Sequence, residues 1–299
     1  MPSLSPLRAR GRAAAILGAA AAVALLASAC APKSDSGSST TASGSASASC
    51  SASSLALYKS GQLTVATDSP AYSPWFDNNQ PSNGKGFESA VAYAVAKELG
   101  FSNSQVKWVT ESFDNSYAPG SKNFDFDINE ISITPTRAKA VDFSTGYYDV
   151  NQGVLTLSSS KYAGATSLSA LKGAKIGVQV STTSYQAVIN EIKPSGSVSV
   201  YNTTDDEVNA LKNGQVDAIV TDMPTVFYLA SAELDNGKIV GQFSYDGGSP
   251  EQFGLLLQKG SALTSCVDQA LAKLKANGEL ASITKQWLSD AADAPELTQ

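Results

Sequence analysis

The chain has 299 residues, of which 42% are hydrophobic and 16% are charged, and its formal net charge is −6. This composition allows a packed globular core, whereas the negative charge argues against nucleic acid as a partner, because phosphate binding needs a concentrated basic face. The sequence contains no histidine, which excludes Ser-His-Asp and Cys-His catalysis and histidine-ligated zinc.

The first 29 residues have the features of an export signal rather than of a folded element. They contain three arginines and no acid, and an apolar run from Ala13 to Leu26 that is short and alanine-rich for a transmembrane span. The sequence Leu26-Ala27-Ser28-Ala29-Cys30 is similar to the lipobox of bacterial lipoproteins. That similarity implies cleavage before Cys30 and lipidation of this cysteine, with ordinary secretion as the alternative.

Residues 30–54 consist mostly of Ser, Ala, Gly and Thr. This composition cannot bury a core and predicts a flexible tether. Acyl chains on Cys30 would then hold the folded body at the outer face of the cell membrane, since more than one chain is needed for stable anchoring.

Two further cysteines, Cys50 and Cys266, follow Cys30 in the chain. In an exported protein an even pair is expected to form a disulfide. The bridge would tie the end of the tether to a predicted helix over 263–276, and two separate thiols are the alternative.

The folded body begins with a predicted strand at Leu63–Thr67, and a loop with two prolines follows it. Asp68 lies at the end of this strand, and Tyr72 and Trp75 lie in the loop. Because ligands bind beyond the carboxyl ends of strands in α/β folds, all three are candidate ligand contacts. Burial of Trp75 in the core is the alternative for that residue.

A helix is predicted over Phe87–Leu99, because apolar residues recur there at helical spacing and Gly100 follows. The next strand is predicted at Val106–Val109. Phe113 follows that strand directly and is a further candidate for the wall of a cleft. No clear helix is predicted over 115–123.

The most informative stretch runs from Phe124 to Tyr148. It begins with apolar and polar residues in alternation, which is the period of a strand. If the strand continues with the same parity, Glu130 and Ser132 share the face begun by Phe124. That face becomes polar toward the strand's carboxyl end, where open α/β sheets bind their ligands.

Arg137 follows Thr134-Pro135, a pair that predicts the start of a helix. A cation in the first helical turn is disfavoured by the helix dipole. We therefore expect the guanidinium to hold an anion, and its planar fork suits a carboxylate. The alternative is that Arg137 pairs with Asp142 and only fixes the local loop.

Strands and helices alternate from residue 175 to residue 232, which predicts a second lobe built on a parallel sheet. Thr182 and Thr183 lie between a predicted strand and a helix N-terminus, a place that favours an anion. Asp222 ends the strand Val216–Thr221, beside the same crevice, and its carboxylate suits an ammonium group. Its alternative role is to cap the following helix.

The sequence from Ser132 to Arg137, SITPTR, is followed by VDFS at Val141–Ser144 and by Tyr147-Tyr148. Together these motifs resemble the polar amino-acid-binding proteins that serve bacterial ABC importers, which are the extracellular solute-binding proteins of family 3. The resemblance covers about Leu63 to Leu288. The helix opening Gly86-Phe87-Glu88 also matches, although the two residues after it depart from the family's signature.

The resemblance implies a fold class, namely two α/β lobes of the Venus-flytrap type (type II) joined by two crossing strands. Lobe one would comprise residues 55–154 and 249–299, and lobe two residues 155–248. The resemblance also implies that Ser132, Arg137 and the pair Thr182-Thr183 hold the α-carboxylate of an amino acid and that Asp222 binds its amino group. Tyr72 and Phe113 would contact the ligand as well.

Glu130 stands where the family commonly has a small residue. Together with Asp68 it would accept a cationic side chain, which favours arginine, lysine or ornithine as the ligand. The alternative is that Glu130 pairs at a lobe surface or supports Arg137 from behind.

The implied partners are a free amino acid, an ABC permease with its ATPase, and the membrane through the lipid anchor. We expect a monomer without cofactor or metal, and the sequence contains no phosphate-binding G-x-x-x-x-G-K-[ST] loop. Two alternatives stay open. One is an enzyme of the same fold, a dehydratase or transglycosylase with Glu130 as its acid, and the other is a sensory lipoprotein without transport.

Overall fold

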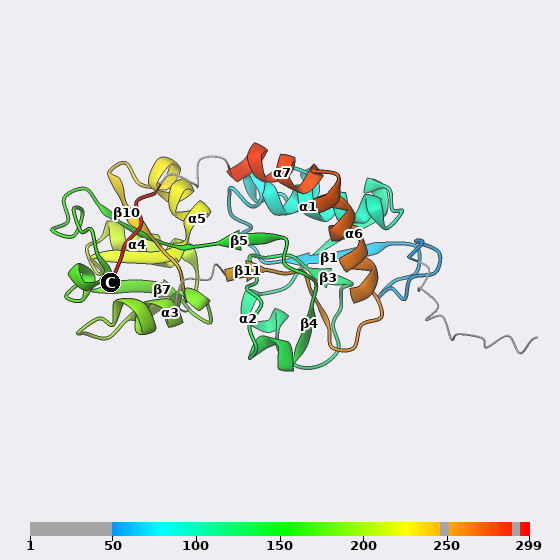
Figure 1. The fold of residues 1–299 in the computed structure, drawn as a ribbon, viewed down its shortest axis with the longest axis horizontal. Coiled ribbons are helices and arrows are strands. Elements are labelled where there is room, and N and C mark those ends of the chain that lie inside the picture. Colours follow the sequence, from blue (N-terminus) through cyan, green and yellow to red (C-terminus); the bar gives the residue numbers. More distant parts are fainter. Residues whose placement is uncertain (1–49, 246–250, 289–293) are drawn as a thin grey trace, which may run out of the picture. The chain divides into compact units, whose positions relative to one another are not determined.

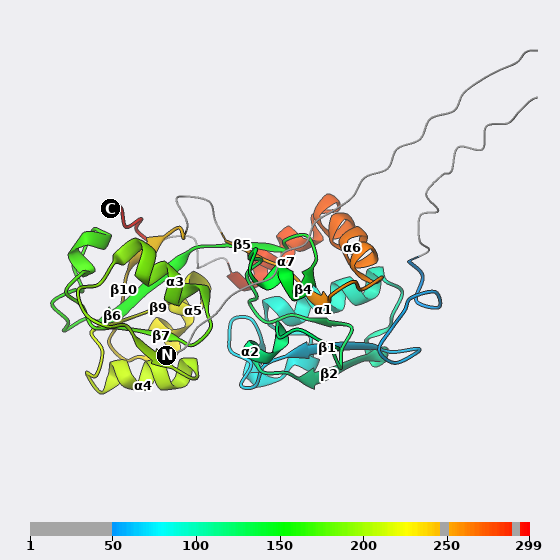
Figure 2. The ribbon, with the colours of Figure 1, turned by 90° about the horizontal axis from the view of Figure 1, so that it is seen from below.

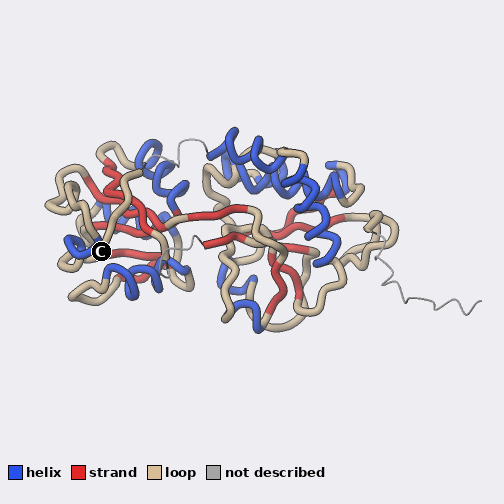
Figure 3. Tube along the Cα trace, viewed as in Figure 1, coloured by secondary structure: helices blue, strands red, loops and turns tan. Residues whose placement is uncertain are grey.

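The computed structural model describes residues 50–245, 251–288 and 294–299. The predicted signal peptide, the lipidation site at Cys30 and most of the predicted tether lie outside the described residues. The body has two α/β lobes, each built on one five-stranded sheet. Strands gather at the centre of each lobe and helices cover them (Figure 3).

Lobe one has the strand order β2-β1-β3-β12-β4. β1 pairs parallel with β2 and β3, whereas β12 pairs antiparallel with β3 and β4. Its strands are β1 (Leu63–Thr67), β2 (Val106–Thr110), β3 (Phe126–Asp127), β4 (Val141–Phe143) and β12 (Leu256–Gln258). Its helices are α1 (Phe87–Glu98), α2 (Phe113–Ser116), α6 (Thr264–Ala276) and α7 (Glu279–Leu288), with 3-10 turns η1 (Asp77–Asn79), η2 (Pro81–Asn83), η3 (Asn103–Gln105) and η4 (Arg137–Lys139). Figure 1 shows α1, α6 and α7 packed together, and their apolar faces form one core with the sheet.

Lobe two has the strand order β10-β6-β9-β7-β8. The pairs β7–β8 and β7–β9 are parallel as the sequence predicts, but β6 and β10 join the sheet antiparallel. Its strands are β6 (Gln152–Leu157), β7 (Ile176–Gln179), β8 (Ser199–Tyr201), β9 (Ala218–Asp222) and β10 (Gly237–Phe243). Its helices are α3 (Thr183–Ala187), α4 (Thr204–Lys212) and α5 (Met223–Tyr228), with η5 (Leu168–Leu171) and the π-turns η6 (Val188–Ile192) and η7 (Leu229–Glu233).

Two short strands connect the lobes. β5 (Tyr148–Val150) leads from β4 into β6, and β11 (Glu251–Phe253) precedes β12. They pair antiparallel with each other as a two-stranded ribbon, which is labelled in Figure 1. This is the pair of crossing strands that the two-lobe fold requires.

The central strand is shorter than the alternation of residues predicts. β3 ends at Asp127, and Glu130 has φ +54°, in the left-handed region. One residue in that region turns the chain out of the extended conformation. The expected parity from Phe124 through Glu130 therefore does not hold in the structure.

The last described residues pair with lobe two, although the sequence places them in lobe one. Thr298 forms a bridge with Ser167 and Glu296 forms one with Gln242. Leu297 is only 4% exposed and packs in the lobe-two core, which explains why the chain returns there. Figure 2 shows the chain end marked C close to this lobe.

The predicted disulfide is confirmed. Cys50 is bonded to Cys266 of α6, across 216 residues of sequence. Cys266 is 2% exposed and belongs to the lobe-one core, and Cys50 packs against that core. The bridge therefore fixes the start of the described chain to lobe one.

Replacing both cysteines, as Cys50→Ser with Cys266→Ser, is expected to lower the free energy of unfolding by roughly 3–5 kcal/mol, because the bridge closes a long loop in the unfolded chain. Urea unfolding of the oxidised protein and of the variant measures the difference. Reductant should shift the midpoint of the natural chain and leave that of the variant unchanged. Equal midpoints for the two oxidised proteins would contradict this expectation.

Candidate functional site

A narrow crevice lies between the lobes. Its cavity volume is about 50 Å³. Residues of both lobes line it, among them these residues singled out from the sequence: Asp68, Tyr72, Phe113, Glu130, Thr182, Thr183 and Asp222. Ser132 and Arg137 are not among the lining residues, but Ser132 lies within 3.4 Å of the lining residue Thr183 and Arg137 contacts the ring of Phe113.

Arg137 is the central cation of the site. It is 8% exposed, and its guanidinium lies against the rings of both Phe113 and Tyr117, at 5.2 and 4.8 Å from their centroids. One terminal nitrogen donates to the Ser132 carbonyl at 2.9 Å, and the other crosses to the Ser181 carbonyl of lobe two at 3.0 Å. Burial lowers the pKa of Arg137, yet arginine remains charged in proteins. A buried positive charge is therefore held here by carbonyls and rings.

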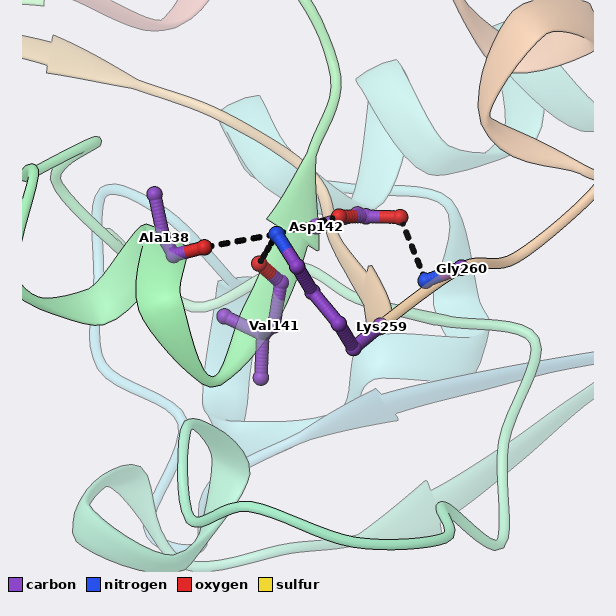
Figure 4. A network of polar contacts seen from close by, with 5 residues as sticks. All are labelled: Ala138, Val141, Asp142, Lys259 and Gly260. Atoms are coloured by element: carbon purple, nitrogen blue, oxygen red, sulfur yellow. Dashed lines mark hydrogen bonds and ion pairs between the residues drawn. The ribbon is translucent and has the colours of Figure 1, made fainter. Parts of the chain in front are cut away.

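The alternative pairing of Arg137 with Asp142 is not what the structure shows. Asp142 forms an ion pair with Lys259 at 2.9 Å and accepts a hydrogen bond from the Gly260 amide at 2.7 Å. Lys259 also donates to the carbonyls of Ala138 and Val141, at 2.7 and 3.3 Å (Figure 4). Lys259 thus stabilises the turn that carries Arg137. It also pairs with Asp142, the acid that lies nearest to Arg137 in the sequence.

The residues predicted to hold a carboxylate gather at this end of the crevice. The Ser132 hydroxyl lies 3.4 Å from the Thr183 hydroxyl across the lobes. Thr182 is the N-cap residue of α3, and its hydroxyl donates to the Gln179 carbonyl at 2.8 Å. Its side chain makes no cap bond to α3, and the residue before it, Ser181, is the one whose carbonyl accepts from Arg137.

Asp222 ends β9 at the other end of the site. The Gln152 amide donates to it at 2.9 Å and also donates to Glu251, on the crossing strand β11, at 2.6 Å. Burial and the nearby Glu251 carboxylate raise the pKa of Asp222 well above its usual range. Its side chain makes no cap bond to α5, so the capping alternative is not observed. An ammonium group at this position would stabilise the ionised carboxylates.

Trp75 does not line the crevice. It is fully buried and packs edge-on against Phe87, Tyr148 and Phe253, with ring centroids 5.6 to 5.9 Å apart. Its indole N–H donates to the Thr225 hydroxyl of lobe two at 2.8 Å. The core alternative is therefore the one that the structure shows, with the added role of joining the lobes.

The other lobe-one candidates lie where the sequence predicts. Asp68 accepts hydrogen bonds from the amides of Ser69 and Phe113, at 2.6 and 3.3 Å, and so ties two loops of the crevice wall together. Burial raises the pKa of Asp68. Burial and the carboxylate of Asp205 in lobe two raise that of the Tyr72 hydroxyl.

Glu130 lines the crevice, and its backbone is in the left-handed conformation. Its carboxylate lies 3.4 Å from the Thr225 hydroxyl of lobe two. Burial, with the nearby carboxyl groups of Glu88 and Asp222, raises the pKa of Glu130 well above its usual range. A cation placed beside Glu130 would restore its ionised form.

Sequence reasoning missed Glu88, in the first turn of α1. It is fully buried, and one carboxyl oxygen accepts hydrogen bonds from the Tyr147 hydroxyl and from the Glu130 amide, the latter at 2.7 Å. Gly86 permits this placement, because a Cβ there would lie 2.4 Å from the Trp75 carbonyl. The available signal was an acid directly after Phe87, at a helix start whose neighbouring residues are buried.

Three other contacts of the site had no signal in the sequence. Thr225, Gln152 and Glu251 join groups that are 70 to 150 residues apart in the chain. Spacing along the sequence cannot reveal such contacts, because they join distant segments that only the tertiary structure brings together.

The model of the bacterial extracellular solute-binding proteins, family 3, matches residues 63–290. The chain belongs to this family. It is 32% identical over 222 residues to the ABC transporter glutamine-binding protein GlnH of Bacillus subtilis (strain 168), covering 72% of this chain and 77% of GlnH. It is 30% identical over 226 residues to the arginine-binding extracellular protein ArtP of the same organism, covering 74% and 84%.

A solved structure of an ancestral arginine-binding protein bound to glutamine has the same fold, with a TM-score of 0.64 and 30% identity. The match covers 77% of this chain and 99% of that protein. The expected family and the two-lobe fold are thus confirmed, and the named relatives of this solute-binding protein are amino-acid-binding proteins.

Among the described residues, no helix combines the length and the apolar character that crossing a membrane requires.

The stability of this solute-binding protein is expected to fall as the pH rises from about 5 to about 8. Burial raises the pKa of Glu88 from 4.5 to about 7, so the folded state favours its neutral form. That stabilisation is complete below the unfolded pKa and is lost as the pH rises through the folded one. For Glu88 alone the loss is on the order of 3 kcal/mol.

Urea unfolding of the natural chain and of Glu88→Gln at pH 5 and pH 8 tests this expectation. Glutamine cannot ionise, so the variant should lose less stability between the two pH values. Glu233→Gln, which changes an exposed acid, serves as the control and should follow the natural chain. Parallel profiles for all three proteins would show that Glu88 is ionised throughout.

Proposed function

We propose that this protein captures a free amino acid between its lobes and delivers it to an ABC permease. The observation that carries the proposal is the placement of Arg137 and Asp222. Arg137 is buried without an ion pair among the described residues, and Asp222 is a desolvated carboxyl group on the other lobe.

A free amino acid complements this pair of charges. Its carboxylate would meet Arg137 and the α3 amides at Thr182-Thr183, and its ammonium group would meet Asp222. The ligand's carboxylate would then accept the hydrogen bond that Arg137 donates to the Ser181 carbonyl in this structure. Because the groups come from both lobes, the ligand gains its full set of contacts only when the lobes are closed, and its binding therefore favours closure.

The charge of the crevice favours a cationic side chain. Three carboxyl groups line it, those of Asp68, Glu130 and Asp222, and no lysine or arginine appears among its described lining residues. One of the three would pair with the ligand's ammonium group, which leaves Asp68 and Glu130 for the side chain. GlnH and ArtP are named for glutamine and arginine, so the acids support the choice of arginine, lysine or ornithine.

Isothermal titration of the chain with Cys30→Ser, used to keep it in solution, tests the ligand class. Arginine, lysine or ornithine should bind more tightly than free glutamine, because only a cationic side chain compensates the two remaining carboxyl groups. Mass spectrometry of the released ligand should find it unchanged, as expected for binding without reaction. Tighter binding of glutamine or of an apolar amino acid would remove the cationic assignment and leave amino-acid capture in place.

Arg137→Ala is expected to weaken binding of the preferred amino acid by roughly 2–5 kcal/mol, because truncation leaves the ligand's carboxylate unpaired in a desolvated site. This corresponds to about 30- to 5,000-fold in the dissociation constant. Lys273→Ala, which removes a surface cation paired with Glu98, is the control and should bind as the natural chain does. An unchanged affinity in Arg137→Ala would refute the carboxylate assignment.

We further propose that lipidation of Cys30 anchors the protein at the outer face of the cell membrane. The lipobox-like sequence that ends at Cys30 and the Ser/Ala/Gly tether after it support this proposal. In the producing bacterium, Cys30→Ser should appear in the culture medium and lose incorporation of labelled palmitate. Cys50→Ser, at the far end of the tether, should keep both the label and the membrane association.

A further inference from the structure

The backbone at Glu130 is held in a conformation that few side chains adopt. Its φ is +54°, and outside glycine this region is favoured mainly by asparagine and aspartate. Phe126 and Ile128 precede it at alternate positions and are fully buried in the lobe-one core. An extended chain would direct Glu130 to that same side. The left-handed turn instead lets its carboxylate line the crevice.

Glu88 is the side chain that holds this turn. Its carboxyl oxygen accepts the Glu130 amide hydrogen at 2.7 Å, in a place where Glu88 has no exposed surface. The same oxygen accepts the Tyr147 hydroxyl, which is also buried. A buried amide without an acceptor is costly, so this contact favours the left-handed turn over other local conformations.

Glu88 is itself fixed by the elements around it. It lies in the first turn of α1, where its own amide donates to the Trp75 carbonyl at 3.0 Å. Tyr147 comes from the segment just before the crossing strand β5 and packs against Phe87 and Phe253. The acceptor for the Glu130 amide is thus built from three separate parts of lobe one.

We propose that Glu88, supported by Tyr147, is a positioning residue that aims the Glu130 carboxylate at the ligand's side chain and so sets the preference for cationic amino acids. This inference rests on the proposed function. Glu88 acts here as a hydrogen-bond acceptor and does not touch the ligand. It follows that an uncharged acceptor of the same shape can replace it, whereas an apolar side chain cannot.

The test compares binding of arginine and of free glutamine by titration calorimetry, in the full chain with Cys30→Ser. The quantity of interest is the ratio of the two affinities in the parent and in Glu88→Gln, Glu88→Leu, Tyr147→Phe and Glu130→Gln. Glu88→Leu should lower the ratio by about tenfold or more, because Glu130 loses the bond that orients it. Glu88→Gln keeps the acceptor oxygen and should preserve the ratio.

Two further measurements separate positioning from a general loss of structure. Adding Glu88→Leu to Glu130→Gln should change the ratio no further, since coupled residues act through one another. Tyr147→Phe removes only a supporting donor and should lower the ratio less than Glu88→Leu does. It keeps the test decisive if Glu88→Leu fails to fold, because an unchanged ratio in Tyr147→Phe would then contradict the proposal.

The outcomes also separate this inference from the function on which it rests. A parent protein that binds no amino acid overturns both. A parent that prefers glutamine keeps amino-acid capture and overturns the inference. If the parent prefers arginine and Glu88→Leu keeps that preference, only the inference fails. A ratio lost equally in Glu88→Gln and Glu88→Leu would show that the charge of Glu88 matters rather than its bond to Glu130.

Discussion

The arrangement of the site depends on one constraint: the guanidinium of Arg137 is buried without a carboxylate partner among the described residues. Desolvating an unpaired charge is costly, and proteins normally offset that cost with an opposite charge. Here Arg137 receives two backbone carbonyls and two aromatic rings instead. The nearest acid in sequence, Asp142, is taken by Lys259. The guanidinium of Arg137 is therefore buried without an anionic partner in the part of the chain that the structure describes, and under the proposed function the ligand's carboxylate would fill that role.

The acids of the crevice are the counterpart of this constraint. Burial raises the pKa values of Glu130 and Asp222 well above their usual range, which means that their charged forms are destabilised in this structure. Under the proposed function, a ligand with a matching positive charge would stabilise those forms, and so it would gain more from a closed state than from an open one. Binding and closure would then be linked through the desolvation of these groups.

The sequence predicted where Ser132, Arg137 and Asp222 lie in the fold better than it predicted the backbone at Glu130. The motif from Ser132 to Arg137 and the strand that ends at Asp222 carry local signals, because strand ends and helix starts are set by nearby residues. The alternation through Phe124 and Phe126 gave the strand but failed at Glu130, since a left-handed residue does not show in a hydrophobic period. The hydrogen bonds of Trp75 and Glu88 join distant segments, and the spacing of residues along the chain does not predict them.

Glu130 lies between the two proposed contacts for the ligand's backbone groups. Its conformation is hard to predict from the sequence, but it bears on which amino acid the site would select. All α-amino acids share a carboxylate and an ammonium group, so the contacts proposed for Arg137 and Asp222 would recognise only the class. Selection of one amino acid within the class would depend on side chains that lie between these two contacts. Such side chains would have to differ from those of relatives that bind another amino acid. Strained backbone persists where surrounding structure enforces it, and it concentrates at binding sites. A glutamate at φ +54°, held by the buried acceptor Glu88, is therefore the expected form of a selective position.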